Sequence, residues 1–122
     1  MSMEESSVAV RLRDILNEID GLRNETTGLK YETFADAWVL RRACERAVEI
    51  ISEASRHIPT EMKDTEPGIP WRQIAGIGNV LRHDYENISS RVIWDIIINH
   101  LDTLESAARR LLAAVEVEPR QR

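Results

Sequence analysis

The sequence is poor in the residues on which several protein classes depend. It contains one cysteine, Cys44, and three histidines, so an intrachain disulfide is excluded and a zinc site would be short of ligands. No apolar run approaches the roughly 20 residues of a membrane span, and the first residues lack the basic and apolar segments of a signal peptide. The 16 Lys and Arg are outnumbered by 21 Asp and Glu, and a net charge of −5 gives no overall attraction to nucleic acid. We therefore expect a cytoplasmic protein without a membrane segment, in which any RNA contact depends on a local basic patch.

What is present is typical of one globular domain. The chain has 122 residues, of which 43% are hydrophobic and 30% are charged, an ordinary composition for a domain of this length. It contains no internal repeat and no low-complexity segment. We expect a single helical domain over residues 1–122, with a charged tail at 118–122.

Apolar residues recur every three or four positions along most of the chain, as they do on one face of a helix. The clearest stripe consists of Trp94, Ile97, Leu101, Leu104, Ala108, Leu111 and Val115. These spacings predict an all-α, up-and-down bundle of about four helices, near 7–22, 33–58, 71–84 and 90–116. Thr33 with Asp36 resembles a capping box, Ser89–Ser90 offers an N-cap, and 59–70 is the one long connection.

The last predicted helix has more apolar surface than one packing face needs. Ile93, Ile96 and Ile98 flank its main stripe. In a small domain a second apolar face indicates a second partner, most simply another copy of the chain. The alternative is that several neighbouring helices bury both faces.

A group of polar side chains stands near the end of the third predicted helix. Asn79, Arg82, His83 and Tyr85 fall within seven residues, and Asn79 and His83 are four apart, which makes them neighbours on a helix. Histidine can move protons near neutral pH, and arginine can bind phosphate. A histidine at a helix end also has an ordinary capping role. The residues alone leave both interpretations open.

The same stretch carries a resemblance to a known family. Residues 69–85 read IPWRQIAGIGNVLRHDY, and this string resembles the signature of the HepT-like family of HEPN-type ribonuclease toxins. The resemblance extends from about residue 10 to residue 112 and includes Ile50–Ala54 and Val92–Asp95.

The resemblance implies a HEPN-like bundle that forms a two-fold homodimer, with the two signature segments meeting in a cleft. It implies a metal-independent endoribonuclease that needs no cofactor and cleaves RNA through attack by the 2′-hydroxyl. It also implies the toxin of a type II or type VII toxin–antitoxin pair, neutralised by a cognate minimal nucleotidyltransferase antitoxin. In such pairs the antitoxin adenylylates a tyrosine of the motif.

The family motif is an arginine, four residues, a histidine, one residue and a tyrosine. By this resemblance His83 corresponds to the catalytic histidine, Tyr85 to the modified tyrosine, and Asn79 to the polar residue that follows the arginine. The arginine position is Gly78, so the cation of the motif is missing. Arg82 is the candidate to replace it, although on a helix it points about 100° away from His83.

The missing cation leaves two functions open. In the first, the chain is an RNase toxin in which His83 acts with another arginine, Arg82 or else Arg72 or Arg91. In the second, it is a non-catalytic HEPN module, a dimeric partner of a nucleotidyltransferase that binds RNA or nucleotide without cleaving. If Gly78 merely leaves the phosphate without a cation, Gly78→Arg should raise cleavage. If Arg82 has taken over the role, Arg82→Ala should abolish cleavage.

Overall fold

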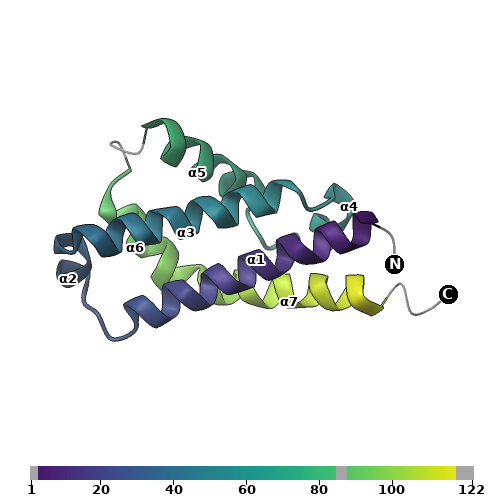
Figure 1. Ribbon diagram of the computed structural model, residues 1–122, viewed down its shortest axis with the longest axis horizontal. Coiled ribbons are helices and arrows are strands. Elements are labelled where there is room, and N and C mark those ends of the chain that lie inside the picture. Colours follow the sequence, from purple (N-terminus) through teal and green to yellow (C-terminus); the bar gives the residue numbers. More distant parts are fainter. Residues whose placement is uncertain (1–2, 85–87, 118–122) are drawn as a thin grey trace.

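The helical spacings of the sequence appear as helices throughout the computed structural model, which describes residues 3–84 and 88–117 (Figure 1). The helices are α1 (Met3–Thr26), α2 (Tyr31–Asp36), α3 (Trp38–Arg56), α4 (Thr60–Lys63), α5 (Trp71–Asp84), α6 (Ser90–Asn99) and α7 (Leu101–Val117). No described residue lies in a strand, so the prediction of an all-α fold is confirmed. Tyr85 and the predicted charged tail lie outside the described residues.

The long helices form an antiparallel bundle. In Figure 1, α1, α3, α5 and the α6–α7 pair run alternately in opposite directions along the molecule. Helix α3 packs against α1 and against α5, and α7 packs against α1. Helix α5 therefore lies at the edge of the bundle, with α3 as its main neighbour.

The core is built from the apolar stripes. Leu12, Ile15 and Ile19 of α1 are completely buried, and the stripe of α6 and α7 is buried at every position from Ile97 to Val115. Its first residue, Trp94, packs on the core while partly exposed. None of the described helices is long and apolar enough to cross a lipid bilayer.

The predicted helix at 33–58 is in fact two helices. It breaks at Ala37 (φ −94°, ψ 89°), which ends α2 and precedes α3. Thr33 is not an N-cap as predicted, because α2 begins before it. The break lets α2 pack against α6, where the buried Phe34 ring lies 5.1 Å from the ring of Trp94, centroid to centroid. Aromatic packing thus favours a bend over a continuous helix.

The predicted helix at 90–116 also breaks, at His100. This residue lies between α6 and α7 with φ −122° and ψ −12°, and its N–H still donates to the carbonyl of Ile96 at 3.0 Å. The apolar stripe continues through the bend, since Ile97 and Leu101 on either side of it are both buried. The prediction of one helix here was wrong because the bend does not interrupt the spacing.

The three isoleucines expected to form a second apolar face of α6 differ in position. Ile93 belongs to the core at 1% exposure, Ile96 is partly buried and Ile98 is 56% exposed. The second face is therefore narrower than the sequence indicates. The predicted cap of this helix is confirmed, because the Oγ of Ser89 accepts a hydrogen bond from the N–H of Val92 at 3.3 Å.

The predicted long connection at 59–70 contains α4 and is tied to its neighbours. The Nε1 of Trp71 donates to the carbonyls of Lys63 and Glu66, both at 3.2 Å. The Glu66 carboxylate accepts two hydrogen bonds from Arg110 of α7, at 2.6 and 2.9 Å. These contacts fix the start of α5, the helix that carries the predicted site residues.

Candidate functional site

Two of the predicted site residues, Asn79 and His83, lie on the outer face of α5. Ile74, Ile77 and Leu81 of the same helix pack on the core. Because successive residues are rotated by about 100°, Asn79 and His83 fall on the opposite side. Both are exposed, and four residues apart they are neighbours on the helix surface. Neither side chain has a hydrogen bond to another of the described residues.

Position 78 does not face that surface. Gly78 is buried against α3, where its N–H donates to the Oγ of Ser52 at 3.0 Å, and the same hydroxyl donates to the carbonyl of Ala75 at 3.0 Å. A Cβ at position 78 would lie 2.3 Å from the Oγ of Ser52. Glycine therefore permits the close approach of α5 to α3, and an arginine side chain has no room there. This packing argues against the expectation that Gly78→Arg raises cleavage.

Arg82 lies on the flank of α5 between α3 and the outer face. Its Nη1 is 3.6 Å from Oε1 of Glu53 on α3, and its side chain is 33% exposed. It is three residues from Asn79 and adjacent in sequence to His83, so it shares the last turn with both. Asn79, Arg82 and His83 thus lie on one turn of α5, and Glu53 of α3 contacts Arg82.

The other candidate residues lie elsewhere or outside the described part of the chain. Arg72 is exposed at the start of α5. The guanidinium of Arg91 lies over the ring of Tyr31, 3.6 Å from its centroid, a cation–π contact that gives Arg91 a structural role. Tyr85 is not among the described residues, so its part in the site stays a prediction.

The sequence predicts no role for the residues of α3 that contact this end of α5. Besides Ser52, these are Glu53 and His57: the Oε2 of Glu53 lies 3.0 Å from Nε2 of His57. The hydrogen bond from His57, with a smaller contribution from the charge of Arg82, holds the pKa of Glu53 below its usual value. The sequence does contain one indication of this contact. Ser52 is a polar residue on the buried stripe of α3, and a buried hydroxyl requires a hydrogen-bond partner.

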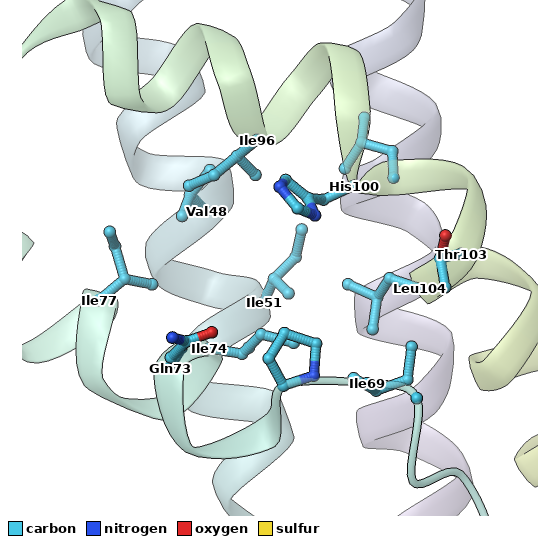
Figure 2. A pocket seen from close by; sticks show the side chains of 13 residues that line it. Val48, Ile51, Ile69, Gln73, Ile74, Ile77, Ile96, His100, Thr103 and Leu104 are labelled. Atoms are coloured by element: carbon cyan, nitrogen blue, oxygen red, sulfur yellow. The ribbon is translucent and has the colours of Figure 1, made fainter.

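An apolar pocket borders the other flank of α5 (Figure 2). Its volume is about 460 Å³, and aliphatic side chains of α3, α5, α6 and α7 line most of it, with Gln73, His100 and Thr103 as its polar side chains. Pockets of this size and lining suit apolar groups. Val80, three residues after the lining residue Ile77, is 37% exposed. Apolar surface therefore continues from the pocket toward the outer face of α5.

The site offers proton transfer and phosphate binding. An imidazole takes and gives protons, a guanidinium forms charge-assisted hydrogen bonds to phosphate, and a carboxamide both donates and accepts. Among the described residues, no three His, Cys, Asp or Glu side chains gather in an arrangement that could hold a metal ion.

Comparisons with known proteins identify relatives over most of the chain. A family model described as "Ribonuclease HepT-like" matches residues 15–111. The protein named "Putative RNase TTE0752", from Caldanaerobacter subterraneus subsp. tengcongensis, is 35% identical over 101 residues, which cover 83% of this chain and 90% of the relative. "Probable ribonuclease HepT" from Thermococcus cleftensis is 33% identical over 100 residues, covering 82% and 91%. "Putative RNase MJ1380" from Methanocaldococcus jannaschii is 34% identical over 95 residues, covering 78% and 87%. No solved structure gives a significant match.

Proposed function

Because the chain belongs to the HepT-like ribonuclease family, we propose that it is a metal-independent endoribonuclease and the toxin of a toxin–antitoxin pair. The observation that carries the proposal is the exposed last turn of α5, on which Asn79, Arg82 and His83 lie together. An imidazole and a guanidinium on the same exposed turn of α5 supply the two kinds of group that metal-free RNA cleavage requires.

In the proposed reaction the 2′-oxygen of a ribose attacks the adjacent phosphorus. The new oxygen–phosphorus bond forms as the bond to the 5′-oxygen breaks, which leaves a 2′,3′-cyclic phosphate and a 5′-hydroxyl. One proton leaves the 2′-hydroxyl and one is taken up by the 5′-oxygen, and His83 is the group that moves them. Arg82 stabilises the charge that develops on the phosphate oxygens, and Asn79 orients the ribose or the phosphate by hydrogen bonding.

An arginine at position 82 can bring its guanidinium to the turn of α5 that contains position 78. The two positions are one helical turn apart on the same edge of α5. Long helical side chains cover the turn on the N-terminal side of their own Cα, so the Arg82 side chain extends back toward Asn79. Its guanidinium lies by Glu53, and the preceding residue of α3, Ser52, contacts Gly78. In our proposal the cation missing at position 78 is supplied from position 82.

The test is an RNA-cleavage assay of chelator-treated protein beside His83→Ala and Arg82→Ala, purified in parallel. We expect cyclic-phosphate products that do not depend on metal, and a rate lowered by about a hundredfold or more in each variant. Arg13→Ala is the control, because Arg13 is an exposed arginine of α1 that pairs with Glu116 at 2.6 Å. Activity lost on chelation and restored by zinc, or full activity of His83→Ala, would refute the mechanism.

One observation favours a second function, binding without cleavage. The Glu53 carboxylate 3.6 Å from Arg82 offsets part of the arginine's charge, and Gly78 supplies none. A non-catalytic HEPN module of this kind would be a dimeric partner of a nucleotidyltransferase. RNA binding by the wild-type protein with no cleavage product would select this function.

A two-fold homodimer is part of the same proposal. The pocket beside α5 and the exposed Val80 next to it form an apolar surface that reaches toward His83, so a second copy seated there would bring its own His83 close. Val80→Glu should turn the dimer into a monomer in sedimentation, and because Val80 is 37% exposed the fold should survive. Val39→Glu, at a 72% exposed valine at the start of α3, is the matched control. A wild-type protein that sediments as a monomer at micromolar concentration would contradict the dimer.

The proposal also includes a cognate minimal nucleotidyltransferase antitoxin that adenylylates Tyr85. An AMP group near His83 would add negative charge and bulk, and both would keep RNA phosphate away. Incubation with ATP, magnesium and the nucleotidyltransferase should add the mass of AMP to the wild-type protein and none to Tyr85→Phe. Tyr31→Phe should be labelled like the wild type, because the Tyr31 hydroxyl is partly buried and bonded to Ser90 at 2.7 Å. Equal labelling of Tyr85→Phe would exclude this tyrosine as the switch.

A further inference from the structure

The carboxylate of Glu53, on α3, has two partners. One of its oxygens faces Arg82, the cation of the candidate site, and the other oxygen faces His57. The Oε1 of Glu53 lies 3.6 Å from Nη1 of Arg82. Its Oε2 lies 3.0 Å from Nε2 of His57, one turn further along α3. Each oxygen therefore has its own partner, and His57 holds the carboxylate while the other oxygen faces Arg82.

The backbone beneath this pair is fixed by separate contacts. Ser52, the residue before Glu53, is bonded to two backbone groups of α5, the N–H of Gly78 and the carbonyl of Ala75, each at 3.0 Å. A Cβ at position 78 would overlap the Ser52 side chain, so the two helices meet as closely as they can at this level. The spacing of Glu53 and Arg82 is thus set by helix packing and not by their own ion pair.

The ion pair itself contributes little to stability. The side chains of Arg82 and Glu53 are 33% and 45% exposed, and ion pairs so exposed are weak. An ion pair of this kind acts on orientation more than on stability, because an arginine side chain has many rotamers and a carboxylate that also contacts His57 favours some of them. A guanidinium has five N–H donors, so the group that faces Glu53 keeps others for phosphate oxygens.

We propose that Glu53 is a positioning residue, which holds the Arg82 guanidinium in the orientation that receives an RNA phosphate beside Asn79 and His83. This inference rests on the proposed ribonuclease function and adds to it a residue from a different helix. Glu53 acts through Arg82 and not on the RNA, because a carboxylate at the phosphate would repel it.

The first test observes the Arg82 side chain directly, by nuclear magnetic resonance of the full chain. The Nε–H signal of Arg82, assigned by its loss in Arg82→Lys, should report an ordered group in the wild type and a more mobile one in Glu53→Gln. Glu116→Gln is the matched control, since Glu116 is 46% exposed and pairs with a different arginine, Arg13, at 2.6 Å. An Arg82 signal that is unchanged by Glu53→Gln would overturn the proposal.

The second test is a double-mutant cycle on RNA cleavage. Glu53→Gln should lower kcat about two- to fivefold, the range that such cycles give for exposed ion pairs. KM and the thermal unfolding midpoint should stay near their wild-type values. In an Arg82→Ala background the same change should cause no further loss, and equal losses in both backgrounds would show that Glu53 acts without Arg82. A wild-type protein that cleaves no RNA would refute the proposed function, and the order of the Arg82 side chain would still decide whether Glu53 holds it.

Discussion

Gly78→Ala should destabilise the protein, although alanine is the better helix former. A Cβ at position 78 would lie 2.3 Å from the Oγ of Ser52 and 2.7 Å from its Cβ, and real Cβ contacts are essentially never shorter than 3.0 Å. Ser52 is buried within α3 and its hydroxyl is bonded to α5 at both Ala75 and Gly78. The Ser52 side chain is therefore not a flexible surface group that can move aside. To admit an added Cβ, α3 and α5 must move apart or these hydrogen bonds must break.

Three contributions determine how much Gly78→Ala lowers the free energy of unfolding. Overpacking of this kind costs about 1–3 kcal/mol. Each hydrogen bond lost at the Ser52 hydroxyl adds about 0.5–1.5 kcal/mol. Against these, alanine gains up to about 1 kcal/mol over glycine inside a helix. We expect a net loss of about 2 kcal/mol, which for a domain of this size lowers the thermal midpoint by about 8 °C.

Urea and thermal unfolding of matched variants test this reasoning. Gly76→Ala, on the same helix, is the control, since a Cβ there has nothing within 4 Å, and it should stabilise by up to about 1 kcal/mol. In a Ser52→Gly background, which removes both clashing atoms, Gly78→Ala should become neutral or stabilising. A Gly78→Ala protein as stable as the wild type would refute the argument. For the same steric reason, Gly78→Arg should be less stable than the wild type and should gain no cleavage.

Three further outcomes follow from contacts away from the site. Ser89→Ala should cost about 1 kcal/mol through loss of the α6 cap, while Ser106→Ala at an exposed position inside α7 should cost nothing measurable. The hydrogen bonds from Arg110 hold the pKa of Glu66 below its usual 4.5. Their stabilisation is therefore present above that value and is lost as pH falls through the lowered pKa, so the thermal midpoint should fall less on acidification in Glu66→Gln than in the wild type. Burial raises the pKa of the Cys44 thiol to about 11. A thiol reagent at pH 8 should therefore label the native protein far more slowly than the urea-unfolded chain. Equal labelling rates would contradict the buried position of Cys44.

The apolar stripes predict the fold well because they record which face of each helix is buried. They do not record bends that leave the stripe intact. At His100 the spacing of three and four continues from Ile97 through Leu101 to Leu104, all of them buried, so nothing in the sequence marks the change of direction. A bend of this kind depends on the different neighbours of the two helices, because α6 packs against α2 and α3 while α7 packs against α1. These contacts join residues far apart in the sequence, so local spacing does not predict them.

The break at Ala37 has a different origin. The sequence there contains neither proline nor glycine, and alanine favours a helix. The contact of Phe34 with Trp94, together with the hydrogen bond between the hydroxyls of Tyr31 and Ser90, draws α2 toward α6. These residues are separated by about half the chain, so local spacing predicts one continuous helix over 33–58 and misses the turn at Ala37.

The position of the site's cation depends on the same kind of distant contact. The spacing within α5 shows that positions 78 and 82 share one edge of the helix, but it does not show which helix that edge meets. The residue that meets it is Ser52, 26 positions earlier in the chain. Its hydroxyl fills the space that a side chain at position 78 would need, and the next residue, Glu53, faces the arginine one turn further on. Ser52 with Gly78 and Glu53 with Arg82 are thus neighbouring contacts between the same two helices, and a substitution at any of the four is expected to change the effect of substitutions at the others.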